Sequence, residues 1–373
     1  MTMRDRILSV YRGETPDVVP YMLDLSHWFY QKNHRPWDLS QEYEKPEYEL
    51  INYHKKAGVG FYIANLASFY SVNYGNDVSV NVRKVVRNGI PEIIWCYTTP
   101  IGSISRTRIW EEETYSWGIR EWGVKTKQDL KILGYALGTR TFSPRWDIYQ
   151  AWVDYVGDIG VVYMPIGYSA MGYLLSLWMG IERTMYAVYD WPEIMHQVVD
   201  QINENNLVCI DMLATSRAEV IIMGDNFSSE IQPPHFFKEW SYLYYVEAVH
   251  HLHTAGKYVA VHIDGKLRGA LSMIQDTGAD CGDAITPTPM GDLTPEQCRK
   301  EAGSNFILSG GVSPDLWLPK TSTKDFKNAV IKWLSLKKYG PRFIANAGDQ
   351  VPPGAVEDRI KIMRDLVEEY GRY

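Results

Sequence analysis

The sequence predicts an α/β protein built as a (β/α)8 TIM barrel, with an antiparallel β insertion after the second strand. Eight short apolar runs alternate with helical segments along the 373 residues. Continuous apolar runs of this kind are typical of parallel strands buried on both faces. Between the second and third runs, residues 78–122 change to alternating, turn-punctuated sequence, which indicates an antiparallel sheet. Since eight strand–helix units close a barrel, we treat residues 1–373 as one domain.

The first part of the chain supplies two of the expected strands. A helix is predicted over residues 4–13, and the first apolar run covers residues 18–23. A charge-rich helical segment over residues 41–57 leads to the second strand, residues 59–65. Inside the insertion, the Asn88-Gly89 pair predicts a tight hairpin turn.

The other six predicted strands also alternate with helical segments. Helical sequence separates them, most clearly from residue 168 to about 215, over 233–255 and over 356–370. The predicted strands are residues 161–166, 218–223, 258–265, 281–285, 306–312 and 342–349.

Polar side chains stand where these runs end. In this fold the reactive groups gather at the carboxyl ends of the strands. His262 and Asp264 are two residues apart and so share a face of their strand. A carboxylate-rich opening with a histidine suits a divalent metal or a hydrogen-bond-rich or cationic substrate, although Asp, Asn and Ser also cap helices. The residues concerned are Asp24, His27, Asn65, Tyr168, Asp225, Glu230, His262, Asp264, Asp283, Ser309, Asn346 and Asp349.

Composition excludes several classes of function. The formal charge of −7 and the lack of a Lys/Arg-rich run argue against a nucleic-acid partner. No apolar stretch reaches membrane-spanning length, and the first residues lack the apolar core of a signal peptide. The four cysteines show no paired spacing, so we expect a cytoplasmic protein. Aromatic residues make up 13% of the chain, which favours a ring-lined pocket.

Three segments resemble the uroporphyrinogen decarboxylase superfamily. They are Arg-Gly-Glu-Thr-Pro-Asp-Val-Val-Pro at residues 12–20, Tyr-Asp-Trp-Pro-Glu at 189–193, and Phe-Ile-Leu-Ser-Gly-Gly-Val at 306–312. The resemblance implies a (β/α)8 barrel and one of two activities. One branch decarboxylates uroporphyrinogen, and the other comprises cobalamin-dependent methyltransferases that act with a corrinoid protein.

Departures from the decarboxylase pattern favour the methyltransferase branch. Decarboxylases hold their polycarboxylate substrate with an arginine-rich loop after the first strand. Residues 23–30 occupy that place as Leu-Asp-Leu-Ser-His-Trp-Phe-Tyr, without an arginine. Tyr173 matches a tyrosine of the decarboxylase pattern, so the resemblance leaves a metal-independent decarboxylase of a porphyrinogen or another acid as the alternative.

The resemblance also implies a metal site. Methyltransferases of this branch bind zinc through His-x-Cys at the fifth strand and a cysteine near the end of the chain. Here His262-Ile-Asp264 and Asp349 stand in those places, so hard ligands replace soft ones. We therefore predict Zn²⁺ held by His262, Asp264 and Asp349, with Glu230 as a further ligand. The competing interpretation is that the metal is lost and the same groups donate hydrogen bonds and a proton.

An oxygen-ligated metal suits an oxygen leaving group, so the predicted methyl donor is an aryl methyl ether that leaves as phenolate. The protein would be the methyltransferase I of an O-demethylase system, acting on the cob(I)alamin of a separate corrinoid carrier protein. Asp225 and Asn346 would orient ligands or bind a ring hydroxyl. A quaternary-amine donor, a non-catalytic barrel and a homodimer stay open. The rings expected to wall the arene are Trp28, Phe29, Tyr30, Phe61, Tyr62, Tyr168 and Tyr173.

Overall fold

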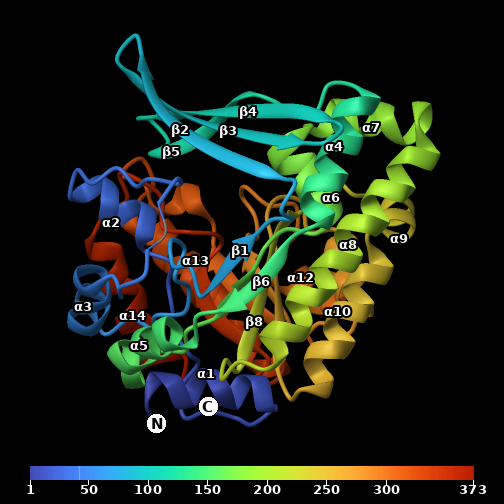
Figure 1. The fold of residues 1–373 in the computed structure, drawn as a ribbon. Helices are drawn as coiled ribbons and strands as arrows, with labels where there is room; N and C mark the ends of the chain where they lie inside the picture. The colour runs from blue at the N-terminus through green and yellow to red at the C-terminus, as the bar shows by residue number, and fades with distance from the viewer. Residues whose placement is uncertain (42) are drawn as a thin grey trace.

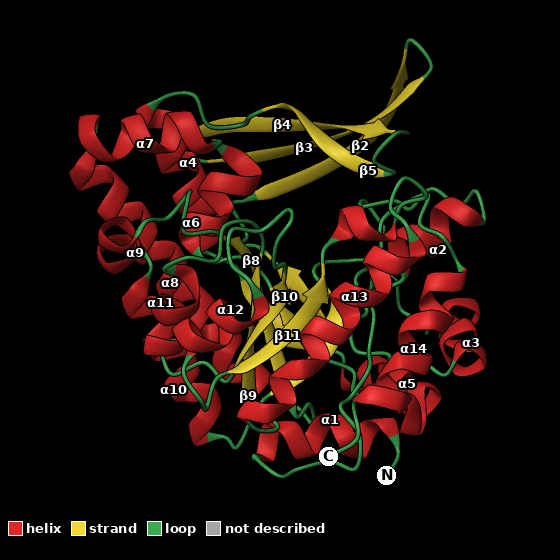
Figure 2. Cartoon of the chain, turned by 180° about the vertical axis from the view of Figure 1, so that it is seen from behind, coloured by secondary structure: helices red, strands yellow, loops and turns green. Residues whose placement is uncertain are grey.

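A computed structural model describes residues 1–41 and 43–373, and its centre is a parallel sheet that curls into a barrel (Figures 1 and 2). Six strands form a continuous parallel sheet in the order β7-β8-β9-β10-β11-β12. Their bounds are β7 Met164–Ile166, β8 Val220–Phe227, β9 Tyr258–Ile263, β10 Cys281–Ile285, β11 Ile307–Val312 and β12 Phe343–Ala347.

Two further segments close the barrel between β12 and β7. Residues 20–23 lie beside β12, and residues 59–62 lie between them and the segment that leads into β7. The eight apolar runs expected from the sequence thus occupy the eight strand positions, which confirms the (β/α)8 fold. The closing contacts are single parallel bridges from Tyr21 to Ala345, from Met22 to Gly60 and from Phe61 to Gly160.

The β insertion forms a four-stranded antiparallel sheet in the order β2-β3-β4-β5. The turn at Asn88-Gly89 takes positive φ at both residues, 53° and 79°, as a two-residue hairpin requires. A short ribbon, β1 (Tyr70–Asn73) and β6 (Thr141–Pro144), connects the sheet to the barrel. Figures 1 and 2 show the sheet lying across one end of the barrel. Its strands are β2 Ser79–Arg87, β3 Ile90–Thr99, β4 Gly102–Glu111 and β5 Ser116–Glu121.

Helices surround the barrel, and several begin later than the sequence suggests. The helix expected over residues 41–57 begins at Tyr48, because Pro46 disfavours helical backbone in the residue before it; Glu42 of that range lies outside the described residues. The helical stretch after β7 contains a π-helical segment, η2 (Tyr173–Trp178). Among the described residues no helix is long and apolar enough to cross a membrane. The α-helices are α1 Met3–Arg12, α2 Ser26–Lys32, α3 Tyr48–Ala57, α4 Lys127–Gly138, α5 Trp146–Val156, α6 Ala170–Gly172, α7 Ile181–Asp190, α8 Pro192–Ala214, α9 Pro234–Trp240, α10 Tyr242–Thr254, α11 Ala270–Asp276, α12 Pro295–Ala302, α13 Thr323–Leu334 and α14 Asp358–Tyr370.

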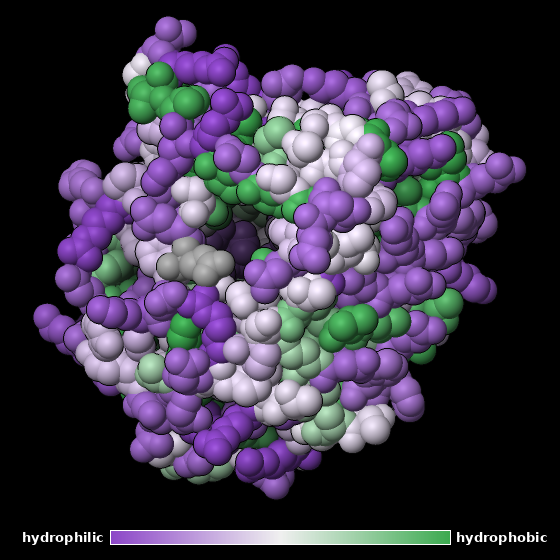
Figure 3. All heavy atoms as spheres, in the orientation of Figure 1, coloured by the Kyte–Doolittle hydropathy of each residue, from purple (hydrophilic) through white to green (hydrophobic). Residues whose placement is uncertain are grey.

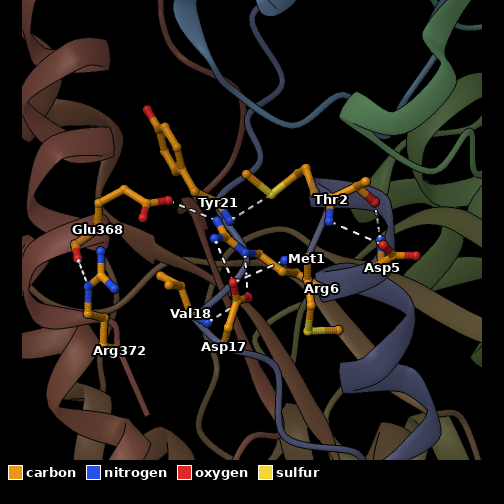
Figure 4. Close-up of polar contacts among 10 residues, drawn as sticks. Met1, Thr2, Asp5, Arg6, Asp17, Val18, Tyr21, Glu368 and Arg372 are labelled. Atoms are coloured by element: carbon orange, nitrogen blue, oxygen red, sulfur yellow. Dashed lines mark hydrogen bonds and ion pairs between the residues drawn. The ribbon is translucent and has the colours of Figure 1, made fainter.

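Helix α1 covers the end of the barrel opposite the inserted sheet. Its Ile7 and Val10 are fully buried in one apolar cluster with inward residues of the strands, such as Ile222 and Ile344. Arg6 anchors the helix: its Nε donates to Asp17 Oδ1 at 2.8 Å and its Nη1 to Glu368 Oε1 at 2.8 Å (Figure 4). This end of the barrel is therefore filled by side chains.

Candidate active site

A cavity of about 550 Å³ lies at the carboxyl ends of the barrel strands, beneath the inserted sheet. The face seen in Figure 3 is hollowed below that sheet. The volume is that of a site for a small organic molecule. Eight of the residues predicted at the strand ends line it: Asp24, His27, Asn65, Tyr168, His262, Asp264, Asp283 and Asp349.

His262 lies at the end of β9 between two carboxylates. Its Nδ1 is 3.3 Å from Asp283 Oδ2 and its Nε2 is 3.9 Å from Asp349 Oδ1. Asp283 pairs with His262 in the register of β9 and β10, which places both side chains at the same level of the barrel. The sequence predicts that His262 and Asp264 share a face of one strand; β9 ends at Ile263, and Asp264 lines the cavity as an exposed residue just beyond it. The carboxylate that contacts the ring is Asp283.

Charge holds the His262 ring in its protonated form. Burial alone would lower the pKa of His262, but the hydrogen bond with Asp283 and the charge of Asp349 raise it to about 9. Burial raises the pKa of Asp349 to about 6, although His262 acts in the opposite direction. At neutral pH the site therefore presents an imidazolium that can donate a proton.

A hydrogen-bonded chain beneath the cavity fixes Asp283. The Asp283 side chain is fully buried and accepts a hydrogen bond from Ser309 Oγ at 3.1 Å. Ser309 Oγ in turn accepts one from Asn346 Nδ2 at 3.2 Å. Asn346 is fully buried and does not line the cavity, so it supports the site from below.

A second polar group occupies the wall next to α2. Asp24 accepts hydrogen bonds from the Ser26 amide at 2.9 Å and the Ser26 hydroxyl at 2.6 Å. Asn65 Nδ2 donates to the other carboxylate oxygen of Asp24 at 2.6 Å. His27 packs on Trp37 with ring centroids 4.9 Å apart, and burial lowers its pKa. Asp24 thus orders the start of α2 while one edge of the group faces the cavity.

Three predicted site residues do not line the cavity, and two of them have structural roles instead. Asp225 is buried and accepts hydrogen bonds from the Ser169 amide and the Tyr245 hydroxyl, each at 2.6 Å. Trp28 is buried in the core and donates from Nε1 to Ala355 O at 3.1 Å. Glu230 is exposed and does not line the cavity, so the structure does not support it as a ligand. A polar residue after a strand carries the same sequence signal whether it faces the cavity or not.

The predicted ring wall is partly wrong. Of the seven rings expected, Tyr62 and Tyr168 line the cavity. Tyr173 lies behind Tyr168, with centroids 5.9 Å apart, and its hydroxyl accepts a hydrogen bond from Arg140 at 3.0 Å. The other four rings belong to the buried core: Trp28, Phe29, Tyr30 and Phe61.

The sequence of residues 159–370 matches the family model described as "Uroporphyrinogen decarboxylase (URO-D)". The chain belongs to the uroporphyrinogen decarboxylase family. Its fold is similar to that of a methyltransferase from Methanosarcina mazei, with 14% identity, 99% of each chain covered and a TM-score of 0.64. A D-psicose 3-epimerase from Clostridium cellulolyticum H10 is also similar, at 10% identity over 60% of this chain and 81% of that chain, with a TM-score of 0.35. No match was found among curated protein sequences.

The inserted sheet gives this family member cavity residues that the sequence did not reveal. Trp95 comes from β3, and Arg106 and Arg108 from β4; Trp37 and Leu39 join them from the loop after α2. The spacing of Arg106-Thr-Arg108 shows that both arginines share a face of a strand. Which face turns to the barrel depends on how the sheet docks, and local sequence does not contain that information.

The residues do not form a preassembled zinc site of the kind expected from the family resemblance. Within residues 1–41 and 43–373, no three His, Cys, Asp or Glu side chains come together in a group that could hold a metal ion. His262 instead lies between Asp283 and Asp349 as an ion-paired ring, and a protonated ring nitrogen has no lone pair for a metal. Zinc stays a prediction from the sequence.

Proposed function

We propose that the protein transfers a methyl group from an aryl methyl ether to the cob(I)alamin of a separate corrinoid protein. One observation carries the proposal: His262 faces a cavity partly walled by aromatic rings, as a proton donor held between Asp283 and Asp349. Membership of the family and the full-length likeness of fold to a methyltransferase support it.

The chain's own residues serve the leaving group. The docked corrinoid would supply the nucleophile that accepts the methyl group. The methyl–oxygen bond breaks with its electron pair on oxygen, and His262 Nε2 donates a proton there, so a neutral phenol leaves. Asp283 fixes the orientation of the ring through Nδ1 and stabilises its charge. The Tyr168, Trp37 and Trp95 side chains would enclose the arene and exclude water.

Acid catalysis at His262 would also favour some classes of methyl donor over others. A quaternary amine leaves as a neutral amine and needs no proton, so a buried acid would contribute nothing to its departure. An ether oxygen leaves as an anion unless it is protonated. The position of His262 therefore favours the ether over the amine.

Decarboxylation is the second candidate, because one observation favours an acidic substrate. Arg106 and Arg108 line the cavity and supply the positive charge that residues 23–30 lack. A decarboxylase would release carbon dioxide from the acid alone and would not consume cob(I)alamin.

Both candidates are tested in one assay with the full chain. The protein is mixed with free cob(I)alamin, kept reduced by titanium(III) citrate, and with 2-methoxyphenol or 3-methoxybenzoate. We expect catechol or 3-hydroxybenzoate to form while the cob(I)alamin absorbance falls in equal amount. Carbon dioxide release from 3-methoxybenzoate or from a porphyrinogen without cob(I)alamin, and no demethylated product, would overturn the proposal and favour the decarboxylase.

A further inference from the structure

Two arginines of the inserted sheet face the cavity from above. Arg106 and Arg108 alternate with Thr107 on β4, so their side chains leave the same face of the strand. Both line the cavity with His262, Asp264 and Asp349. The cavity therefore has a basic side on the inserted sheet and an acidic side on the barrel.

The Arg106 side chain is held in place by rings. Its guanidinium lies 4.8 Å from the ring centroid of Trp95 and 4.9 Å from that of Trp178. Its Nη1 donates to Leu177 O at 3.0 Å. Stacking between two indoles fixes the plane of a guanidinium without neutralising it.

Both arginines keep unused donors. The Nε atoms of Arg106 and Arg108 are buried without a hydrogen-bond partner in the described part of the chain. Arg108 donates from Nη1 to Trp117 O at the long distance of 3.4 Å. A buried charged donor without a partner is unfavourable, so the protein leaves the hydrogen-bonding capacity of both guanidinium groups incompletely satisfied.

Neither arginine has a carboxylate counterpart. Among the described residues no Asp or Glu oxygen lies within 4.0 Å of Arg106 or Arg108, whereas Arg87 and Arg120 of the same sheet both pair with Glu92. Burial and then the neighbouring charge of Arg108 lower the pKa of Arg106 to about 10. Two adjacent, partly buried cations call for an anion that the protein itself does not supply.

The opposite side of the cavity would repel such an anion. Asp24, Asp264, Asp283 and Asp349 line it there, around His262. A carboxylate-bearing ligand is therefore oriented with its anionic group towards the inserted sheet and its neutral group towards His262. This polarity matches a molecule with an acid at one end and a methoxy group at the other.

We propose that Arg106 and Arg108 form an anion subsite for a carboxylate of the substrate, which makes the methyl donor a methoxy-substituted aromatic acid. The methoxy part of this inference rests on the proposed function, whereas the anion subsite does not. The carboxylate would accept hydrogen bonds from Nη donors of the two guanidinium groups.

Equilibrium binding to the full chain, without cob(I)alamin, tests the subsite. Tryptophan fluorescence is titrated with 3-methoxybenzoate and with 3-methoxybenzamide, its neutral analogue. We expect the acid to bind at least about tenfold more tightly than the amide. Arg106→Gln and Arg108→Gln should each weaken acid binding by about tenfold or more and leave amide binding nearly unchanged. Arg83→Gln, an exposed arginine of β2, is the matched control and should bind like the wild type.

The outcomes separate the two proposals. Equal binding of acid and amide by the wild type overturns the subsite even if the glutamine variants fail to fold, because that comparison needs no variant. Wild-type affinity in folded Arg106→Gln and Arg108→Gln also overturns it. Tight, arginine-dependent binding of the acid without methyl transfer to cob(I)alamin supports the subsite and overturns the aryl ether proposal.

Discussion

The imidazole of His262 and the carboxylate of Asp283 face each other across neighbouring strands of the barrel, with Nδ1 3.3 Å from Oδ2. Since Asp283 is fully buried and is itself held by Ser309, the ring cannot turn without losing a charged partner. The other ring nitrogen is thereby directed towards Asp349 and the cavity.

Removal of either member should disable turnover. We expect His262→Asn and Asp283→Asn to lower the demethylation rate by about 10²–10⁴-fold, as loss of a general acid does. Activity is measured as product formed per unit time, with circular dichroism to show that each variant is folded. His251→Asn removes the ring of the exposed His251–Asp211 pair between α10 and α8 and is the control. A wild-type rate in His262→Asn would show that His262 does not take part in the reaction.

The pH profile should reflect the same group. Above a pH of about 9 His262 loses the proton that it would donate, so kcat/KM should fall on the alkaline side. In Asp349→Asn the imidazolium loses a neighbouring charge, and the alkaline limb should move to lower pH. An alkaline limb that stays in place in this variant would show that another group is titrating.

Metal content separates acid catalysis from the zinc hypothesis. Because the described residues offer no group of three His, Cys, Asp or Glu ligands, we expect purified protein to contain far less than one equivalent of zinc. Elemental analysis of the wild type and His262→Ala measures it. One equivalent in the wild type that disappears in His262→Ala would show that the site rearranges around zinc.

Acid should destabilise the protein through His54. Burial lowers the pKa of this residue from 6.5 to about 4, and its Nδ1 has no hydrogen-bond partner among the described residues. Between these two pKa values His54 is protonated in the unfolded chain and neutral in the folded chain. Stability that is present above pH 6.5 is therefore lost as the pH falls towards 4, and the loss in the free energy of unfolding is on the order of 3 kcal/mol. Urea unfolding at pH 7 and pH 4.5 measures the loss. In His54→Gln the free energy of unfolding should differ less between the two pH values. An unchanged difference would show that other groups cause the loss of stability in acid.

Barrel closure should depend on Gly160. A Cβ at this position would lie 1.8 Å from the carbonyl oxygen of Phe61, inside the bridge that joins residues 59–62 to the segment before β7. We expect Gly160→Ala to lower the free energy of unfolding by about 3 kcal/mol or more. Gly224→Ala is the control, because its Cβ would meet nothing closer than 3.9 Å. Equal stability of the two variants would mean that the backbone shifts freely at the bridge.

The comparison of sequence and structure shows where local patterns carry information. The eight apolar runs predict the barrel because burial on both faces of a parallel strand leaves a signal within each run. The sequence also places His262, Asp264 and Asp349 in the cavity, because the carboxyl ends of the strands converge in this fold. Asp225 and Trp28 have the same sequence context but point into packed protein, and nothing local distinguishes them. Arg106 and Arg108 enter the site through the docking of a separate sheet, which is a long-range event.

Under the proposed function, the filled end of the barrel would set the order in which substrate and carrier bind. Helix α1 fills that end through Ile7 and Val10, and the cavity opens at the other end, beneath the inserted sheet. A corrinoid protein that delivers its cofactor there would cover the same opening of the cavity. The methyl donor would then have to bind before the carrier protein docks, and the demethylated product could leave only after the carrier dissociates. A compulsory sequence of this kind would make the departure of the carrier, and not the breaking of the methyl–oxygen bond, a step that can limit the whole cycle.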